Sequence, residues 1–244
     1  MHLKLLACKV LQREISMLIA QSEHFIDVTY IRQDFHDTPQ LLQVTLQEEI
    51  DKLDADDDKY SCNKPIDAIL LGYGLCSNGV TGLKSSRHKL VIPKAHDCIT
   101  FLLGSRKAYN HHFVNSPGTY WYSIGWAENT RLPSQMRLEE IKAEYIEIYG
   151  EENADYLMQM EHNWVVDYKR AGFIHWNGIK SDKALQYSKE CAQSLQWEHQ
   201  QYEGEETFLS NFLEAKWDAE NFLILEPGQT AEQSYAEDVI KVKD

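Results

Sequence analysis

Apolar and polar residues alternate along the first half of the chain in a pattern that predicts strands and helices in turn. Short apolar runs of the kind found in buried strands occupy residues 2–7, 25–30, 66–73 and 90–93. Between them, apolar residues recur at helical spacing over residues 10–21 and 39–53, and Asp97 is a suitable N-cap for a helix over 97–105. This order predicts an α/β fold, a Rossmann-like doubly wound parallel sheet.

The second half of the chain has a more helical pattern. Apolar spacing predicts helices over residues 134–149, 153–168 and 183–201. Two short apolar runs, 173–176 and 222–225, predict further strands. We therefore expect an α/β domain over residues 1–126, followed over 127–244 by an additional, mainly helical part that packs on it and could complete its sheet.

Composition and charge narrow the class of protein. The chain has 244 residues, of which 43% are hydrophobic, enough for a substantial core. No run approaches the roughly 18 uninterrupted apolar residues of a membrane helix, and the apolar N-terminal segment takes on charge too early for a signal peptide. A formal net charge of −14 disfavours nucleic acid as a partner. We expect a cytoplasmic protein that binds neither membranes nor nucleic acid.

Three of the five cysteines directly follow predicted strands: Cys8, Cys76 in GYGLCSNG, and Cys98 in AHDC. In an open parallel sheet those loops meet at one edge, where such folds bind ligands. The odd number of cysteines and the lack of a CxxC motif argue against a disulfide framework or a zinc finger. Cys62 and Cys191 lie in polar segments and are interpreted as incidental thiols.

Three converging thiols predict a metal site. Thiolates suit zinc, copper(I) or an iron–sulfur cluster, and three thiolates sharing a zinc ion at about 2.3 Å each would lie within about 4 Å of one another. His96 could be a fourth ligand or a proton donor. Glu14, at the border of the first helix's apolar face, could be an acid, a base or a ligand, although a surface carboxylate is an equal alternative.

The position of Cys98 leaves a metal-free alternative open. If Asp97 caps the helix, Cys98 lies at its positive end, where the pKa of a thiol falls. A thiolate there would serve as a metal ligand. It would equally serve as a nucleophile, assisted by His96.

Glycines and aromatic residues complete the candidate site. Gly72, Gly74 and Gly79 permit tight turns and close approach of a ligand to the backbone, but their spacing matches neither a dinucleotide fingerprint nor a P-loop. The alternative is a tight strand-to-helix turn. In PGTYWYSIGW, Tyr120 and Trp121 could form the wall of a cavity for a flat ligand, or simply belong to an ordinary strand.

Four segments together resemble an uncharacterised bacterial and archaeal family, domain of unknown function 1638: ACKVLQREI, LGYGLCSNG, IPKAHDCITFLLGS and PGTYWYSIGW. They cover most of the first half, with Lys94 where the family tends to have arginine. The resemblance implies no defined activity. Its members look like neighbours of corrinoid-dependent methyl-transfer systems, which implies a corrinoid protein or a small-molecule substrate as partner.

The leading hypothesis is a metal-binding α/β protein with zinc at the three cysteines. Its reaction would be methyl or one-carbon transfer linked to corrinoid systems, which would make it a metal-dependent transferase. One alternative is an iron–sulfur cluster protein. Another is an accessory protein that binds a corrinoid or a metal without turnover.

Overall fold

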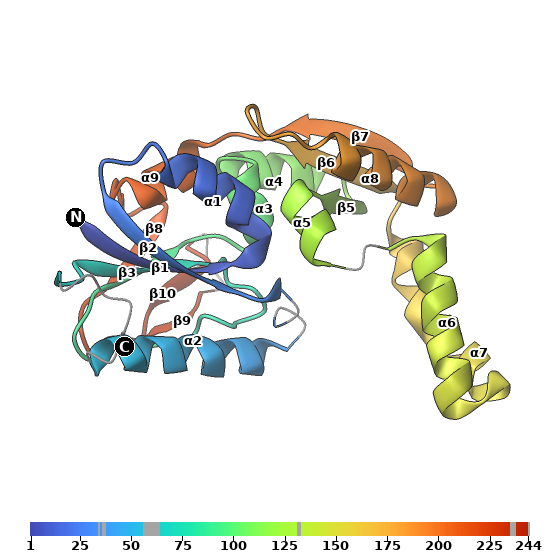
Figure 1. Cartoon of the computed structure of the whole chain (residues 1–244), viewed down its shortest axis with the longest axis horizontal. Coiled ribbons are helices and arrows are strands. Elements are labelled where there is room, and N and C mark those ends of the chain that lie inside the picture. Colours follow the sequence, from blue (N-terminus) through green and yellow to red (C-terminus); the bar gives the residue numbers. More distant parts are fainter. Residues whose placement is uncertain (34, 36–37, 56–63, 131–132, 235–237, 244) are drawn as a thin grey trace. The chain divides into compact units, whose positions relative to one another are not determined.

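The computed structural model describes residues 1–33, 35, 38–55, 64–130, 133–234 and 238–243. Cys62 lies outside these residues. The chain forms two compact units (Figure 1): Met1–Ala108 together with Glu205–Asp244, and Tyr109–Gly204. The expected domains, 1–126 and 127–244, divide the chain elsewhere, although the return of Glu205–Asp244 to the first unit agrees with the expectation that the later part could complete the first sheet.

A five-stranded, mostly parallel sheet forms the centre of the first unit. Its order is β2-β1-β3-β4-β8, where the strands are β1 (His2–Cys8), β2 (Phe25–Ile31), β3 (Ala68–Gly72), β4 (Leu90–Pro93) and β8 (Phe222–Leu225). The first four are parallel, and β8 pairs antiparallel with β4. The alternation of strands and helices therefore correctly predicted an α/β fold with a central sheet.

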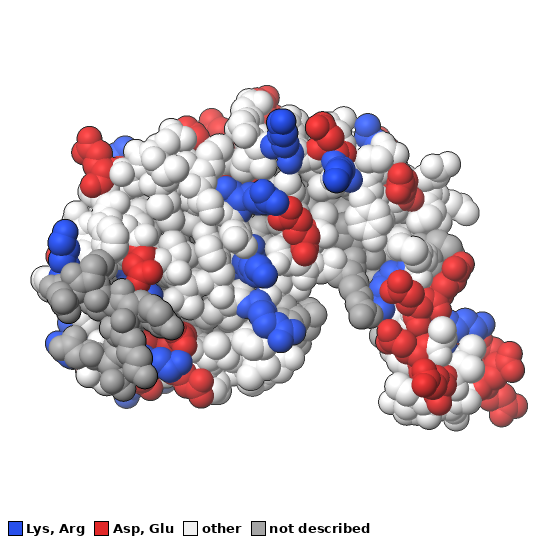
Figure 2. All heavy atoms as spheres, in the orientation of Figure 1, with Lys and Arg blue, Asp and Glu red and all other residues white. Residues whose placement is uncertain are grey.

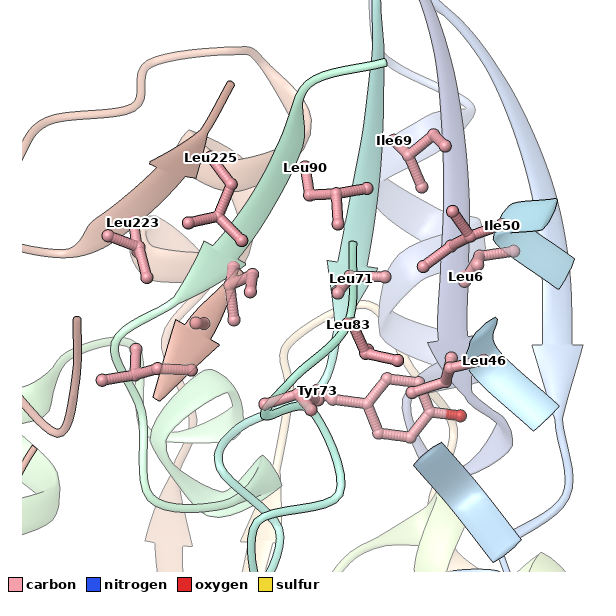
Figure 3. Packing of buried hydrophobic residues seen from close by; sticks show 14 of the residues in the cluster. Leu6, Leu46, Ile50, Ile69, Leu71, Tyr73, Leu83, Leu90, Leu223 and Leu225 are labelled. Atoms are coloured by element: carbon pink, nitrogen blue, oxygen red, sulfur yellow. The ribbon is translucent and has the colours of Figure 1, made fainter. Parts of the chain in front are cut away.

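Helices cover both faces of this sheet (Figure 1). On one face, α2 (Pro39–Asp54) packs its leucines onto the strands, and Leu46 lies in one cluster with Leu6 and Leu71 (Figure 3). The hairpin of β9 (Ala231–Gln233) and β10 (Ile240–Val242) joins this cluster.

The other face carries α1 (Gln12–Ile19), which follows the short helix η1 (Lys9–Leu11), together with α3 (Cys98–Leu102) and α9 (Thr207–Leu213) (Figure 1). The Phe101 ring of α3 meets the Phe208 ring of α9 at a centroid distance of 5.5 Å. Burial of both faces explains why β3 is apolar throughout, since every one of its residues is buried.

The second unit has a parallel three-stranded sheet in the order β5 (Thr119–Tyr122), β6 (Arg170–His175), β7 (Glu198–Glu203). Its helices are α5 (Ile124–Asn129), α6 (Gln135–Tyr149), α7 (Glu151–Asn163), η3 (Val165–Asp167) and α8 (Asp182–Ser194), and α4 (Arg106–Asn115) crosses the boundary between the units. The predicted helix over 183–201 is wrong beyond Ser194, where a polar edge strand pairs with β6.

Helices α6 and α7 form a hairpin and are largely exposed. Lys142 of α6 and Asp155 of α7 form an ion pair of 2.8 Å across it. Acidic side chains gather on this hairpin, as Figure 2 shows for one face of the molecule. Along the described residues, every helix is too short or too polar to cross a membrane.

Candidate metal centre

The three cysteines of the expected site all belong to the first unit and follow neighbouring parallel strands. Cys8 is the last residue of β1, Cys76 lies in the loop after β3, and Cys98 is the first residue of α3, after β4. Because β1, β3 and β4 are consecutive in the sheet, their carboxyl ends share one edge. The strand order therefore brings together three loops that are far apart in sequence.

Backbone hydrogen bonds join two of these loops beyond the end of the sheet. The N–H of Leu75 donates to the carbonyl of Ala95 over 2.7 Å, and the N–H of Cys76 donates to the carbonyl of His96 over 3.1 Å. The pairing of the chain after β3 with the chain after β4 fixes Cys76 close to the segment that leads into Cys98.

The three thiols lie within electrostatic range of one another. Burial raises the pKa of each thiol, that of Cys8 to about 11. A negative charge on Cys8 further raises the pKa of Cys76, and charges on both raise the pKa of Cys98. Cys76 belongs to the hydrophobic cluster under α2, and Cys8 packs against that cluster. Burial and neighbouring charge therefore both disfavour the ionised form of these thiols.

The expectation of a lowered pKa at Cys98 is wrong. Asp97 is indeed the N-cap of α3, since its carboxylate accepts from the N–H of Ile99 over 2.9 Å. The helix has only five residues, however, and burial together with the adjacent Asp97 charge raises the pKa of Cys98 well above its ordinary value. The raised pKa does not favour a metal-free nucleophile, which needs a thiolate near neutral pH, and that alternative stays a prediction.

Two further candidate residues have contrasting surroundings. The His96 side chain is exposed, whereas Glu14 in α1 is buried with 2% exposure. The interpretation of Glu14 as a surface carboxylate is therefore wrong, while its role as acid, base or ligand stays a prediction. Over the described ranges, no group of three or more His, Cys, Asp or Glu side chains is already arranged to hold a metal ion.

The loop that carries Cys76 has an unusual backbone. Cys76, Ser77 and Asn78 have positive φ angles of 44°, 55° and 73°, in the region that favours glycine. Each such residue stores conformational strain, and strain of this kind collects at functional sites. Asn78 was a sequence signal for it, because asparagine tolerates positive φ, whereas nothing in the sequence indicated it at Cys76 and Ser77.

The three glycines of this loop serve packing within the chain. A Cβ atom added to Gly72 would lie 2.8 Å from the Cβ of Ala7, and one added to Gly79 would lie 2.6 Å from Cδ2 of Leu42. At Gly74 the added atom would lie 2.6 Å from the backbone nitrogen of Asp97. Protein atoms fill the space that each glycine leaves, which favours the tight-turn alternative over approach of a ligand.

Tyr73 is a candidate that the sequence interpretation missed. It follows β3, is 4% exposed, and belongs to the cluster that includes Cys76. Its hydroxyl has no hydrogen-bond partner in the described part of the chain, and the same holds for the Thr100 hydroxyl in α3. A signal was present: the run over residues 66–73 is almost wholly apolar and ends on a hydroxyl group.

Tyr120 and Trp121 belong to β5 of the second unit. The Tyr120 hydroxyl accepts from the indole N–H of Trp126 over 3.3 Å, and its ring lies 5.4–5.9 Å from the rings of Trp164, Tyr168 and Trp197. Trp121 packs on Tyr202 at a centroid distance of 4.8 Å. These contacts favour the ordinary-strand alternative, and a role in ligand binding stays a prediction.

We compared the chain with known protein families, with curated proteins and with solved structures. A family model described as a protein of unknown function, DUF1638, matches residues 30–213. This region includes Cys76, His96 and Cys98 and begins after Cys8 and Glu14. No curated protein and no solved structure matches the chain.

Proposed function

The chain belongs to the DUF1638 family of proteins of unknown function, and we propose that this member is a metal-binding α/β protein whose ligands are the thiolates of Cys8, Cys76 and Cys98. One observation carries the proposal. The three thiols lie at or just beyond the carboxyl ends of β1, β3 and β4, which are consecutive in the sheet, so the segments that carry them share one edge.

The chemistry of the donor set supports the proposal. Burial opposes the ionisation of each thiol. A divalent cation would offset both the free-energy cost of burying a thiolate and the mutual repulsion of three thiolates. The described residues hold no preformed metal group, so the proposal requires the site to rearrange when metal binds. Zinc is the first choice because it takes thiolate ligands without redox chemistry. A zinc ion held by three thiolates and one open position can activate a substrate thiol for methylation.

The sheet order supports this location for a ligand. We propose that the sheet is doubly wound in the Rossmann-like manner, because the order β2-β1-β3-β4 reverses direction between β1 and β3. Ligands of such sheets bind beyond the carboxyl ends of the strands at the reversal. Cys8 and Cys76 follow the two strands that flank it.

The reaction we propose is methyl or other one-carbon transfer in the cytoplasm, with a small molecule or a corrinoid protein as partner. Its support is the family resemblance together with the thiolate donor set. In this reaction His96 would act as the fourth ligand or as a proton donor. Glu14, a buried carboxylate on the helix that follows Cys8, would act as an acid or a base.

Elemental analysis of the full-length protein purified without oxygen tests the metal site. We expect about one equivalent of zinc in the wild type and less than about a tenth of an equivalent in Cys8→Ser, Cys76→Ser and Cys98→Ser. Cys191→Ser is the matched control, because Cys191 is a buried thiol of α8 in the second unit and should leave the zinc content unchanged.

Three other results would replace or refute this proposal. Iron with acid-labile sulfide would replace zinc by an iron–sulfur cluster. Corrinoid binding that survives replacement of all three cysteines would favour an accessory protein. A wild type with no metal and three freely titrating thiols would refute the metal site.

A further inference from the structure

The hairpin of α6 and α7 carries many exposed apolar side chains. Of the fifteen large hydrophobic side chains that are exposed in the described part of the chain, seven lie between residues 136 and 164. The exposed fraction reaches 66% at Ile148 and 64% at Tyr156. Single exposed hydrophobic residues are normal on a protein surface, but a group of them on one element marks an interaction surface.

The hairpin has little of the second unit to pack against. Among the described elements, α6 packs mainly on α7, and α7 packs on α6 and on the short helix η3. Leu138 and Ala154 are buried, whereas most other described side chains of the two helices face water. A helix that carries apolar residues beyond its packed stripe is typical of an element that covers a further partner.

The exposed apolar residues of α7 form a stripe. Tyr156, Met160 and Trp164 follow one another at a spacing of four residues, which places them on one face of the helix. At the end of the stripe, the Trp164 ring lies 5.8 Å from the Tyr120 ring and 5.7 Å from the Tyr168 ring, so other aromatic side chains of the same unit hold it in place. Tyrosine, tryptophan and methionine are enriched in the cores of protein interfaces, and a ridge of this spacing packs well against another helix.

The surroundings of this stripe are strongly acidic. Residues 136–160 include seven acidic residues, all of them exposed, and two basic ones (Figure 2). The basic side chains already have partners within the hairpin, since Arg137 lies 3.6 Å from Glu140 and Lys142 lies 2.8 Å from Asp155. A surface with this charge attracts a basic partner, and it repels nucleic acid, anionic membranes and a second copy of the same hairpin.

We propose that the hairpin is a docking site for a basic amphipathic helix of a partner protein. The apolar face of that helix covers Tyr156, Met160 and Trp164, and its lysine and arginine side chains meet the carboxylates of α6 and α7. This is helix-to-helix recognition, in which an apolar stripe supplies affinity and the charges supply specificity. The inference goes beyond the proposed metal site and does not depend on it.

A fluorescein-labelled peptide of about 14 residues, with leucine and lysine in the amphipathic helical pattern, is the probe. Fluorescence anisotropy with the full-length protein should show saturable binding, which weakens as the ionic strength rises from about 0.05 to 0.5 M. A peptide of the same composition with its leucines scattered around the helix should bind at least about tenfold more weakly, because it has no apolar face. A peptide with glutamate in place of lysine should also bind at least about tenfold more weakly, because the hairpin repels it.

A double substitution, Tyr156→Ser with Met160→Ser, tests the location. We expect it to weaken binding of the leucine–lysine peptide at least about tenfold. Phe113→Ser with Val114→Ser is the matched control, because it removes apolar side chains of α4 that are 67% and 73% exposed, and it should bind the peptide as the wild type does. All four side chains are exposed, so both variants should keep the thermal unfolding temperature of the wild type.

Four outcomes would overturn the inference. Equal peptide affinity in the wild type and in Tyr156→Ser with Met160→Ser would place binding elsewhere. Equal affinity for the scattered peptide would reduce the interaction to charge alone. A dimer in light scattering that the double substitution dissociates would make the occupant a second copy of this chain. Binding to anionic phosphatidylglycerol vesicles that the same substitution abolishes would make the occupant a membrane.

Discussion

The carboxylate of Asp97 accepts a hydrogen bond from the backbone N–H of Ile99 over 2.9 Å, and this contact fixes the start of α3 at Cys98. Replacement of Asp97 by alanine removes the cap and should lower the free energy of unfolding by about 1 kcal/mol. Asp97→Asn retains a capping oxygen and should lose far less. Urea denaturation of the metal-free proteins measures both variants, and equal losses would mean that the cap contributes little.

Ser77 has a φ of 55° and lies in the middle of three successive residues with positive φ. Glycine adopts this conformation without steric cost, so Ser77→Gly should raise the free energy of unfolding by up to about 1 kcal/mol. Asn78→Gly should gain less, because asparagine tolerates positive φ better than serine. Chemical denaturation of the metal-free variants tests this order. A clear loss of stability in Ser77→Gly would contradict the presence of strain at this position.

The sequence predicted the first unit well where burial fixes the pattern. The runs over 90–93 and 222–225 are β4 and β8 to the residue, because both strands are apolar without interruption. β4 is buried throughout, whereas β8 is an edge strand in which Ile224 is exposed. β7 was missed because Glu198–Glu203 is a largely exposed edge strand without apolar alternation. Its strand character comes from backbone pairing with β6, which side-chain patterns do not record.

The site was partly predictable for a similar reason. Convergence of the loops that carry Cys8, Cys76 and Cys98 follows from parallel strands alone, which the strand–helix alternation indicated. The direction of the pKa shift at Cys98 depends on burial and on neighbouring charges, and neither can be judged from a helix N-terminus in the sequence. The unpartnered hydroxyl of Tyr73 likewise depends on which side chains surround it in the folded chain.

Gly74 permits close contact between the loops that carry Cys76 and Cys98. An alanine Cβ there would lie 2.6 Å from the Asp97 nitrogen and 2.9 Å from the Ala95 oxygen, both of them backbone atoms that cannot rotate away. Gly74→Ala should therefore lower the free energy of unfolding by about 2–3 kcal/mol and reduce the metal content.

Gly228→Ala is the control for this substitution. Gly228 has a φ of 86° with nothing within 4 Å of the added atom, so its replacement should lose only about 1 kcal/mol, from backbone strain, and should retain the metal. If Gly74→Ala and Gly228→Ala lost the same amount of stability and the same amount of metal, the result would contradict a packing role for Gly74.

Asp54, at the end of α2, binds the segment that precedes β4. Its carboxylate accepts from the Ser85 hydroxyl over 2.5 Å and from the N–H and hydroxyl of Ser86 over 2.6 and 2.9 Å. Partial burial alone would raise the pKa of Asp54, but these hydrogen bonds outweigh it and hold the pKa below its ordinary value. The folded state therefore favours the ionised form of Asp54.

The stability that comes from the ionised Asp54 is fully present above the pKa of this carboxyl in the unfolded chain, about 4. It is lost as the pH falls through the lower pKa of Asp54 in the folded protein. The difference in unfolding free energy between wild type and Asp54→Asn should accordingly be largest at pH 6–7 and shrink below about pH 4. Ser85→Ala, which removes one donor, should reduce the same pH dependence. Urea titrations between about pH 7 and pH 2.5 measure this pH dependence. If the difference in unfolding free energy between wild type and Asp54→Asn stayed constant over that range, Asp54 ionisation would not stabilise the fold.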